Sequence, residues 1–185
     1  MRICAAFLFT FFALLLGGCV PNAVTYYRPV VDGGKVLKPH CVPTESIVEF
    51  NLPNANGRLQ VRAWADNGKH VNQIALFFSG KAWREIHFTS TDFRIRDLEE
   101  KSILGASSVM AYKADSIESL TSEPYLAPPD RPGLPRFHVQ INLHRPLPNS
   151  FELLSPSIVI DGEEIKFPVI RFEQRQWMGI SPFNC

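Results

Sequence analysis

The fold class follows from residues 137–144, which read Phe137-His138-Val139-Gln140-Ile141-Asn142-Leu143-His144. Apolar and polar side chains alternate strictly along this stretch. Because successive side chains of a strand point to opposite faces of a sheet, one face would be buried and the other would meet water. The pattern predicts an amphipathic strand in an antiparallel sheet.

Strand patterns continue on the N-terminal and C-terminal sides of this stretch. Residues 46–52 and 58–65 also alternate, and residues 73–79 form a more continuous apolar run, typical of a central strand that is covered on both faces. The dipeptide Asp161-Gly162 lies between two short apolar runs and favours a tight hairpin. These features predict short strands joined by regular turns.

Two interruptions shape the rest of the chain. The apolar positions change parity near residues 89–92, which predicts a turn or bulge there, and the prolines within residues 124–135 predict an extended surface loop. We expect about eight or nine strands and no βαβ units. The predicted fold class is all-β, an antiparallel β-sandwich of immunoglobulin-like arrangement, with a small β-barrel as the alternative.

The N-terminus carries a separate signal. Arg2 precedes an apolar run over residues 3–16, and Gly17-Gly18 then lead directly to Cys19. At about fourteen residues the run is shorter than the roughly twenty needed to cross a bilayer, and a basic start followed by a short apolar run is typical of a secretory signal. Two other interpretations remain: an ordinary signal peptide with a chance cysteine, and an uncleaved membrane anchor.

The sequence Leu16-Gly17-Gly18-Cys19 resembles the lipobox of bacterial lipoproteins. The resemblance implies cleavage before Cys19, acyl chains such as palmitate on Cys19, and attachment to the membrane through them. The next residue is Val20 rather than the Asp that retains such proteins in the inner membrane, so the resemblance points to the outer membrane, facing the periplasm.

Removal of residues 1–18 from the 185-residue chain leaves 167 residues, the size of one domain. We expect residues 1–18 to be the signal peptide, residues 19–43 the lipidated N-terminus and tether, and residues 44–185 the β-sandwich domain. The whole chain has 19 basic and 18 acidic residues, a balance that gives no electrostatic footprint for nucleic acid. The residues 174–185 include Trp177 and Met178, and we expect this tail to pack against the domain.

Two of the four cysteines remain once Cys4 is removed with the signal and Cys19 is acylated. We predict a Cys41–Cys185 disulfide, because the envelope outside the cytoplasm is oxidising. Free or metal-bound thiols are the alternative, although the two cysteines lack the close spacing of a metal site.

The sequence contains no recognisable catalytic or cofactor motif. A GxSxG turn and a glycine-rich phosphate loop are missing, and the histidines lack metal-ligand spacing. His138 and His144 share a predicted strand face about 20 Å apart, and we interpret them as residues of a solvated face. We therefore predict no enzyme activity, no cofactor and no metal, while a catalytic site that converges only in the fold remains open.

Candidate contact residues are grouped near the middle of the chain. The residues Lys81, Arg84, Arg94 and Arg96, with Trp83 among them, suggest either a partner-binding patch or a charged outer sheet face. Tyr125, in the proline-rich segment, is either a partner anchor or a cover for the core. Trp83, Arg84 and Tyr125 are the predicted partner contacts.

The favoured function is a non-catalytic protein-binding or structural module of the cell envelope, anchored to the membrane through Cys19 and facing an envelope protein partner. The alternatives are an immunity lipoprotein that neutralises a secreted toxin, and an envelope hydrolase whose site is not visible in the sequence.

Overall fold

Strands make up the regular structure of the protein. The computed structural model describes residues 21–38, 45–52, 57–64, 72–80, 84–113, 116–126 and 137–180. These ranges contain sixteen strands, arranged in three antiparallel sheets, and no helix. Nowhere in them does a helix reach the length and hydropathy needed to span a bilayer.

The three sheets differ in size and in the order of their strands. Across the five-stranded sheet lie, in turn, β1 (Pro21–Val30), β16 (Ile170–Ile180), β13 (Ser150–Leu154), β7 (Arg94–Asp97) and β8 (Ile103–Gly105). Across the seven-stranded sheet lie β10 (Ile117–Ser119), β9 (Ser108–Tyr112), β12 (Phe137–Asn142), β5 (Gln73–Gly80), β4 (Gly57–Trp64), β3 (Ile47–Leu52) and β2 (Lys35–Leu37). Across the four-stranded sheet lie β11 (Tyr125–Leu126), β6 (Glu85–Phe88), β14 (Ile158–Ile160) and β15 (Glu163–Ile165).

The alternating stretch of the sequence forms β12, which lies in the middle of the seven-stranded sheet between β9 and β5. Phe137, Val139 and Ile141 are at most 2% exposed, and the polar residues between them point to the opposite face. The predicted amphipathic strand is therefore confirmed, and its apolar face forms part of the core.

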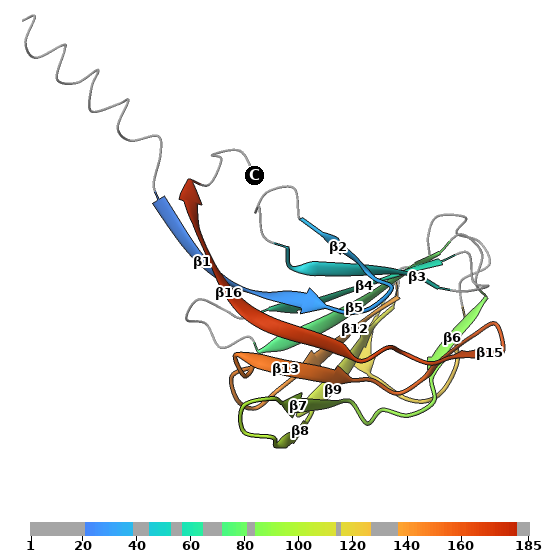
Figure 1. The fold of residues 1–185 in the computed structure, drawn as a ribbon. Helices are drawn as coiled ribbons and strands as arrows, with labels where there is room; N and C mark the ends of the chain where they lie inside the picture. Colours follow the sequence, from blue (N-terminus) through green and yellow to red (C-terminus); the bar gives the residue numbers. More distant parts are fainter. Residues whose placement is uncertain are drawn as a thin grey trace, which may run out of the picture.

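The other two sheets cover this apolar face. The buried residues of all three sheets belong to one hydrophobic core. Phe88 of β6, for example, lies with its ring centroid 5.9 Å from that of Phe78 of β5 and 5.0 Å from that of Phe93. Figure 1 shows the five-stranded sheet lying across the seven-stranded sheet. The predicted antiparallel β-sandwich is confirmed, and the sheets are open rather than closed into the alternative barrel.

The parity change near residues 89–92 is the place where the chain leaves one sheet for another. β6 belongs to the four-stranded sheet, whereas β7 belongs to the five-stranded sheet. The link is held by hydrogen bonds from the backbone N–H of Thr89 to the carbonyl oxygen of Ser157 (2.9 Å) and from that of Phe93 to the carbonyl oxygen of Thr91 (3.0 Å). The predicted turn therefore lets consecutive strands enter two different sheets.

The predicted tether is largely built into the sheets. In the segment 19–43, residues 21–30 form β1, which pairs with β16 over its whole length, and residues 35–37 form β2. Tyr27 of β1 is only 1% exposed, so this segment contributes to the core. The sheets thus already include two strands, β1 and β2, that precede residue 44.

Candidate functional site

Two of the three predicted contact residues meet at one edge of the four-stranded sheet. β6 pairs with the terminal strand β11, with Tyr125 opposite Ile86 and Leu126 opposite Glu85. Arg84 directly precedes β6 and is exposed, so it lies beside this edge. Trp83 lies outside the described residues. The pairing thus brings together residues that are about forty positions apart in the sequence, and we call the exposed Arg84 and Leu126, together with Tyr125, the Tyr125 edge.

A hairpin on the other side of β6 fixes the position of Arg84. Asp161 and Gly162 have φ angles of 51° and 83°, which both suit the tight two-residue hairpin that joins β14 to β15. Oδ1 of Asp161 accepts hydrogen bonds from the backbone N–H groups of Arg84 (2.6 Å) and Glu85 (3.0 Å). The predicted Asp161-Gly162 hairpin is confirmed, and it also holds the start of β6.

The Tyr125 side chain covers part of the core, which is one of the two roles weighed from the sequence, and its role as a partner contact stays a prediction. Its ring stacks on Phe137 of the core, with centroids 5.6 Å apart and planes inclined by 19°. Nζ of Lys113 lies 5.6 Å from the Tyr125 ring centroid, in reach of a cation–π attraction, and 2.8 Å from Oε2 of Glu118. The hydrogen bond from Lys113, joined by one from Ser116, lowers the pKa of the Glu118 carboxyl. Tyr125 is therefore a partly exposed ring held in one position.

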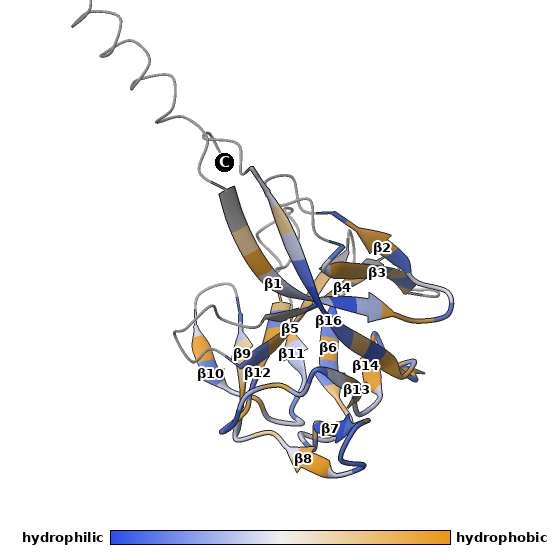
Figure 2. Cartoon of the chain, turned by 60° about the vertical axis from the view of Figure 1, so that its left-hand side comes forward, coloured by the Kyte–Doolittle hydropathy of each residue, from blue (hydrophilic) through white to orange (hydrophobic). Residues whose placement is uncertain are grey.

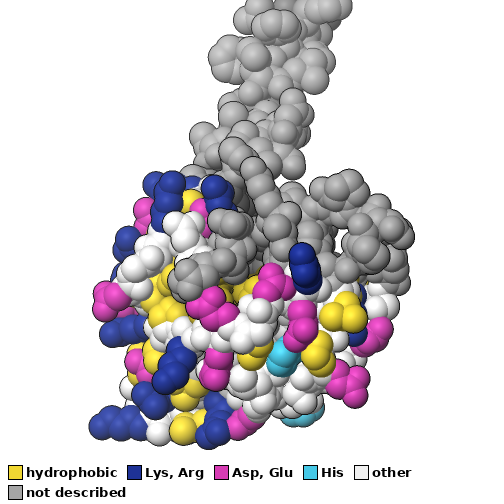
Figure 3. Space-filling model, turned by 90° about the vertical axis from the view of Figure 1, so that its right-hand side faces the viewer, with side chains coloured by type: hydrophobic (Ala, Val, Ile, Leu, Met, Phe, Trp, Pro, Cys, Tyr) yellow, Lys and Arg dark blue, Asp and Glu magenta, His cyan; other side chains and the backbone are white. Residues whose placement is uncertain are grey.

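A shallow recess lies next to Tyr125, between β6, β9 and the segment after β10. His87, Lys113 and Glu123 are among the polar residues that line it. The recess has room for about one water-sized group, so it cannot enclose a substrate. Nδ1 of His87 is buried without a hydrogen bond and lies 3.3 Å from Oε1 of Glu85. Figure 3 views this side of the molecule and shows a histidine bordered by acidic and apolar side chains, with Lys and Arg gathered toward one side.

The predicted basic patch is divided between two sheets. Arg84 lies beside β6, whereas Arg94 and Arg96 belong to β7 of the five-stranded sheet. The Arg94 guanidinium donates to Asp92 (2.8 Å), and Arg96 donates to Glu152 on the neighbouring strand β13 (2.9 Å). These ion pairs favour a charged outer sheet face for Arg94 and Arg96, so Arg84 is the one described member of the predicted patch that belongs to the Tyr125 edge. Lys81 is outside the described residues.

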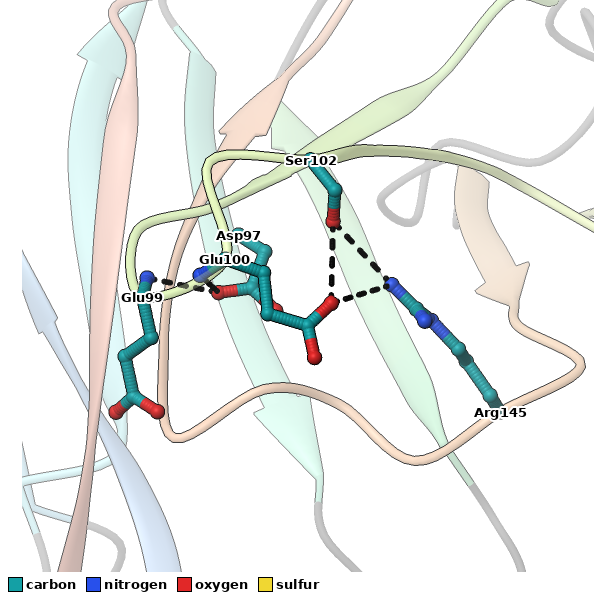
Figure 4. Close-up of polar contacts among 5 residues, drawn as sticks. All are labelled: Asp97, Glu99, Glu100, Ser102 and Arg145. Atoms are coloured by element: carbon teal, nitrogen blue, oxygen red, sulfur yellow. Dashed lines mark hydrogen bonds and ion pairs between the residues drawn. The ribbon is translucent and has the colours of Figure 1, made fainter.

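A polar cluster at the turn between β7 and β8 is a structural clamp (Figure 4). Asp97 is 5% exposed, and its Oδ1 accepts hydrogen bonds from the backbone N–H groups of Glu99 (2.8 Å) and Glu100 (3.0 Å). Arg145, from the loop after β12, lies 3.7 Å from Oε2 of Glu100 and 3.4 Å from Oγ of Ser102. The acidic groups are thus used to close the turn. Among the described residues, no three His, Cys, Asp or Glu side chains are placed to hold a metal ion.

The outer face of the seven-stranded sheet carries an aromatic row that the sequence did not predict. The His138 ring stacks on Tyr112 (4.1 Å between centroids, 13° between planes) and lies 5.2 Å from the Phe77 ring. Burial between these rings lowers the pKa of His138. The predicted solvated face is therefore half-covered at His138, because the strand register places Tyr112 and Phe77 directly beside it.

The cysteines assigned to lipidation and to the disulfide, Cys19, Cys41 and Cys185, lie outside the described residues. The disulfide stays a prediction. The strand β1 begins at Pro21, two residues after Cys19, and Pro21 pairs with Ile180 at the free end of β16.

The chain matches no protein-family model, no curated protein and no solved structure with which it was compared.

Proposed function

We propose that this chain is a lipid-anchored module of the bacterial cell envelope that binds another envelope protein through the Tyr125 edge and performs no catalysis. In this proposal acyl chains on Cys19 hold it in the outer membrane, and the sandwich faces the periplasm. The exposed position of the Tyr125 edge, on the side of the molecule away from the anchored end, is the observation that carries the proposal.

The anchor rests on the resemblance of residues 16–19 to a lipobox, and the position of β1 supports it. Each buried CH₂ of an acyl chain contributes about 0.8 kcal/mol, so more than one chain gives stable attachment. The sandwich begins at Pro21, so only residue 20 lies between the acylated cysteine and the first strand. A body attached so closely has one end held at the membrane and the opposite end directed into the periplasm.

The arrangement of the body supports binding at that opposite end. Figure 1 shows the free ends of β1 and β16 on one side of the body, and β6 and β15 on the other. Leu126 is 67% exposed beside the exposed Arg84, and Tyr125 is pre-oriented by Phe137 and Lys113. An aromatic ring of fixed orientation with an arginine and an aliphatic side chain nearby is typical of a protein contact. The recess beside it is too small for a substrate, which favours surface contact over catalysis.

Site-specific photocrosslinking in cells tests the contact. A photoreactive amino acid replaces Leu126 in the full-length protein, and the matched control replaces Ile103, which is 55% exposed on the terminal strand β8 of another sheet. We expect a discrete adduct from position 126 that Arg84→Glu weakens, and none from position 103. Equal adducts at both positions, or none at 126, would refute the proposed edge. A secreted toxin in the adduct would specify an immunity lipoprotein.

Membrane fractionation tests the anchor separately. We expect Cys19→Ala to give an unprocessed or soluble form, because the acylated cysteine is removed. Intact mass measurement of the native mature protein should show acyl chains at its N-terminus. Unchanged membrane association of Cys19→Ala, or a mature N-terminus without acyl chains, would contradict the proposal.

A further inference from the structure

The strands β1 and β16 continue as a two-stranded ribbon beyond the sandwich. β16 pairs with β13 only through residues 170–173, whereas it pairs with β1 as far as residue 180. Figures 1 and 2 both show the paired ends of β1 and β16 projecting from the body. We call residues 21–25 of β1 and residues 176–180 of β16 the ribbon tip.

The ribbon tip carries no charged residue on either strand. Moving toward the body, the first charged positions are Arg175, opposite Tyr26, and Arg28, opposite Glu173. Arg175 and Arg28 are both tied to carboxylates, at 2.6 Å from Glu173 and 2.8 Å from Glu45 respectively. The uncharged part is about 17 Å long at 3.3 Å per residue, and a band of charged residues follows it.

Large apolar side chains lie on the ribbon tip. Met178 is 79% exposed, the most exposed of the large hydrophobic residues in the described ranges. Trp177, on the opposite face, lies over Gly179, since a Cβ at residue 179 would overlap the indole ring. The indole therefore extends along the strand toward its free end. Trp is enriched where proteins meet the boundary between lipid headgroups and acyl chains.

The proposed lipid anchor at Cys19 would bring the ribbon tip close to the membrane surface. From Cys19 to Pro21 the chain reaches at most about 7 Å, so a lipid-bound Cys19 holds the tip within the depth of the headgroups. We propose that the ribbon tip lies in the headgroup region of the anchoring membrane, with Trp177 and Met178 in contact with lipid. This inference rests on the proposed lipidation of Cys19. It gives the exposed Met178 and the partly exposed Trp177 a lipid surface as their partner.

The unpaired backbone groups along the edges of the ribbon tip limit how deeply it can enter the membrane. Beyond Gln174, whose backbone N–H still donates to the carbonyl oxygen of Asn149 (2.6 Å), β16 pairs with β1 and with no other described strand, and β1 is a terminal strand of its sheet. Backbone N–H and C=O groups along such edges must find water or other polar groups, which the hydrocarbon core does not offer. The tip therefore belongs in the interface and does not cross into the acyl region. The Arg28 and Arg175 side chains then lie on its aqueous side.

Quenching of tryptophan fluorescence by brominated lipids tests the inference. The mature full-length protein is reconstituted into vesicles of phosphatidylethanolamine and phosphatidylglycerol that contain lipid brominated close to the glycerol. Trp177→Phe is the matched variant, and it measures the background from Trp64 and Trp83. We expect strong quenching of the native protein and loss of most of it in Trp177→Phe. Lipid brominated near the methyl end should quench less.

Flotation of the same vesicles separates this inference from the proposed function. Protein that floats with the vesicles, but shows equal quenching in both variants or stronger quenching by the deep bromines, would overturn the interfacial tip and leave the anchor intact. Protein that does not float would overturn the anchor and, with it, the inference. Matching thermal unfolding of the two variants verifies that Trp177→Phe keeps the fold.

Discussion

The two halves of β16 both pair with β1, but their side chains differ in burial. Residues 171–173 lie between β1 and β13, and Phe172 there is 0% exposed. In the distal half, Gln174 still donates a backbone hydrogen bond to Asn149, but residues 175–180 pair with β1 alone among the described strands, and Met178 there is 79% exposed. Backbone pairing with β1 continues through both halves, so the difference lies in what covers the side chains.

Because of this difference, one half of β16 contributes to the stability of the fold and the other half offers side chains for a contact at the surface. Burial of an apolar side chain contributes about 1.5–3 kcal/mol, whereas an exposed one contributes little. The proximal half therefore holds the five-stranded sheet on the core. The distal half retains Met178 without that gain and Trp177 with only part of it, and this is why we assign them a contact outside the chain.

Phe172→Ala should have the largest effect on stability. The Phe172 ring stacks on Phe151, with centroids 5.0 Å apart, so truncation removes apolar burial and leaves a cavity. We expect the free energy of unfolding to fall by about 3–5 kcal/mol. Urea denaturation measures this as a lower midpoint with an unchanged slope. Val169→Ala, at a position that is 52% exposed, is the control and should cost less than about 0.5 kcal/mol. A loss below about 1 kcal/mol for Phe172→Ala would mean that the proximal half is not the packed half.

Tyr27→Phe should have a smaller effect, and one that depends on pH. The buried Tyr27 hydroxyl donates to the carbonyl oxygen of Leu147 (2.9 Å), and losing that bond costs about 1–2 kcal/mol. Burial raises the pKa of Tyr27 from 10.0 to about 12, although a hydrogen bond from Gln174 opposes the shift. The native state thus favours the neutral phenol, so its stabilising effect is complete below pH 10 and is lost as the pH rises through about 12.

Urea denaturation at a series of alkaline pH values measures this dependence. The native protein should lose stability more steeply than Tyr27→Phe between pH 10 and about 12. Parallel curves for the two proteins would show that Tyr27 does not carry the pH dependence.

The sequence predicted the sandwich because alternation at β12 and the turn chemistry at Asp161-Gly162 act locally. Both features reappear in the structure, the first as alternating burial along β12 and the second as the hairpin between β14 and β15. It did not predict three sheets, since the parity change near residues 89–92 reveals a turn but not that the next strand joins another sheet. Nor did it predict that β1 pairs with β16, a contact between residues about 150 positions apart. Such pairings depend on the whole core and leave no local pattern.

The site was predicted in part for the same reason. Arg84 and Tyr125 were chosen by residue type, and only the pairing of β6 with β11 shows that they share an edge. The aromatic row at His138 was missed because its three rings come from three strands, and no local spacing connects them. The tail was expected to pack on the domain, but Met178 is exposed on the ribbon tip. Hydrophobicity predicts burial only where the fold supplies a covering surface.

Met178→Ser should have the smallest effect on stability, and this gives the sharpest contrast with Phe172. Ser removes most of the apolar side chain and keeps β16 paired with β1. We therefore expect the free energy of unfolding, measured by urea denaturation, to change by less than about 0.5 kcal/mol. A loss of about 2 kcal/mol would mean that Met178 already has a packing partner within the folded chain, and the tip would then need no membrane contact. If stability is unchanged and bromolipid quenching of Trp177 decreases, Met178 acts only when lipid is present. The two halves of β16 would then differ in the way that their burial indicates: one half holds the fold together, and the other meets the surface to which the fold is attached.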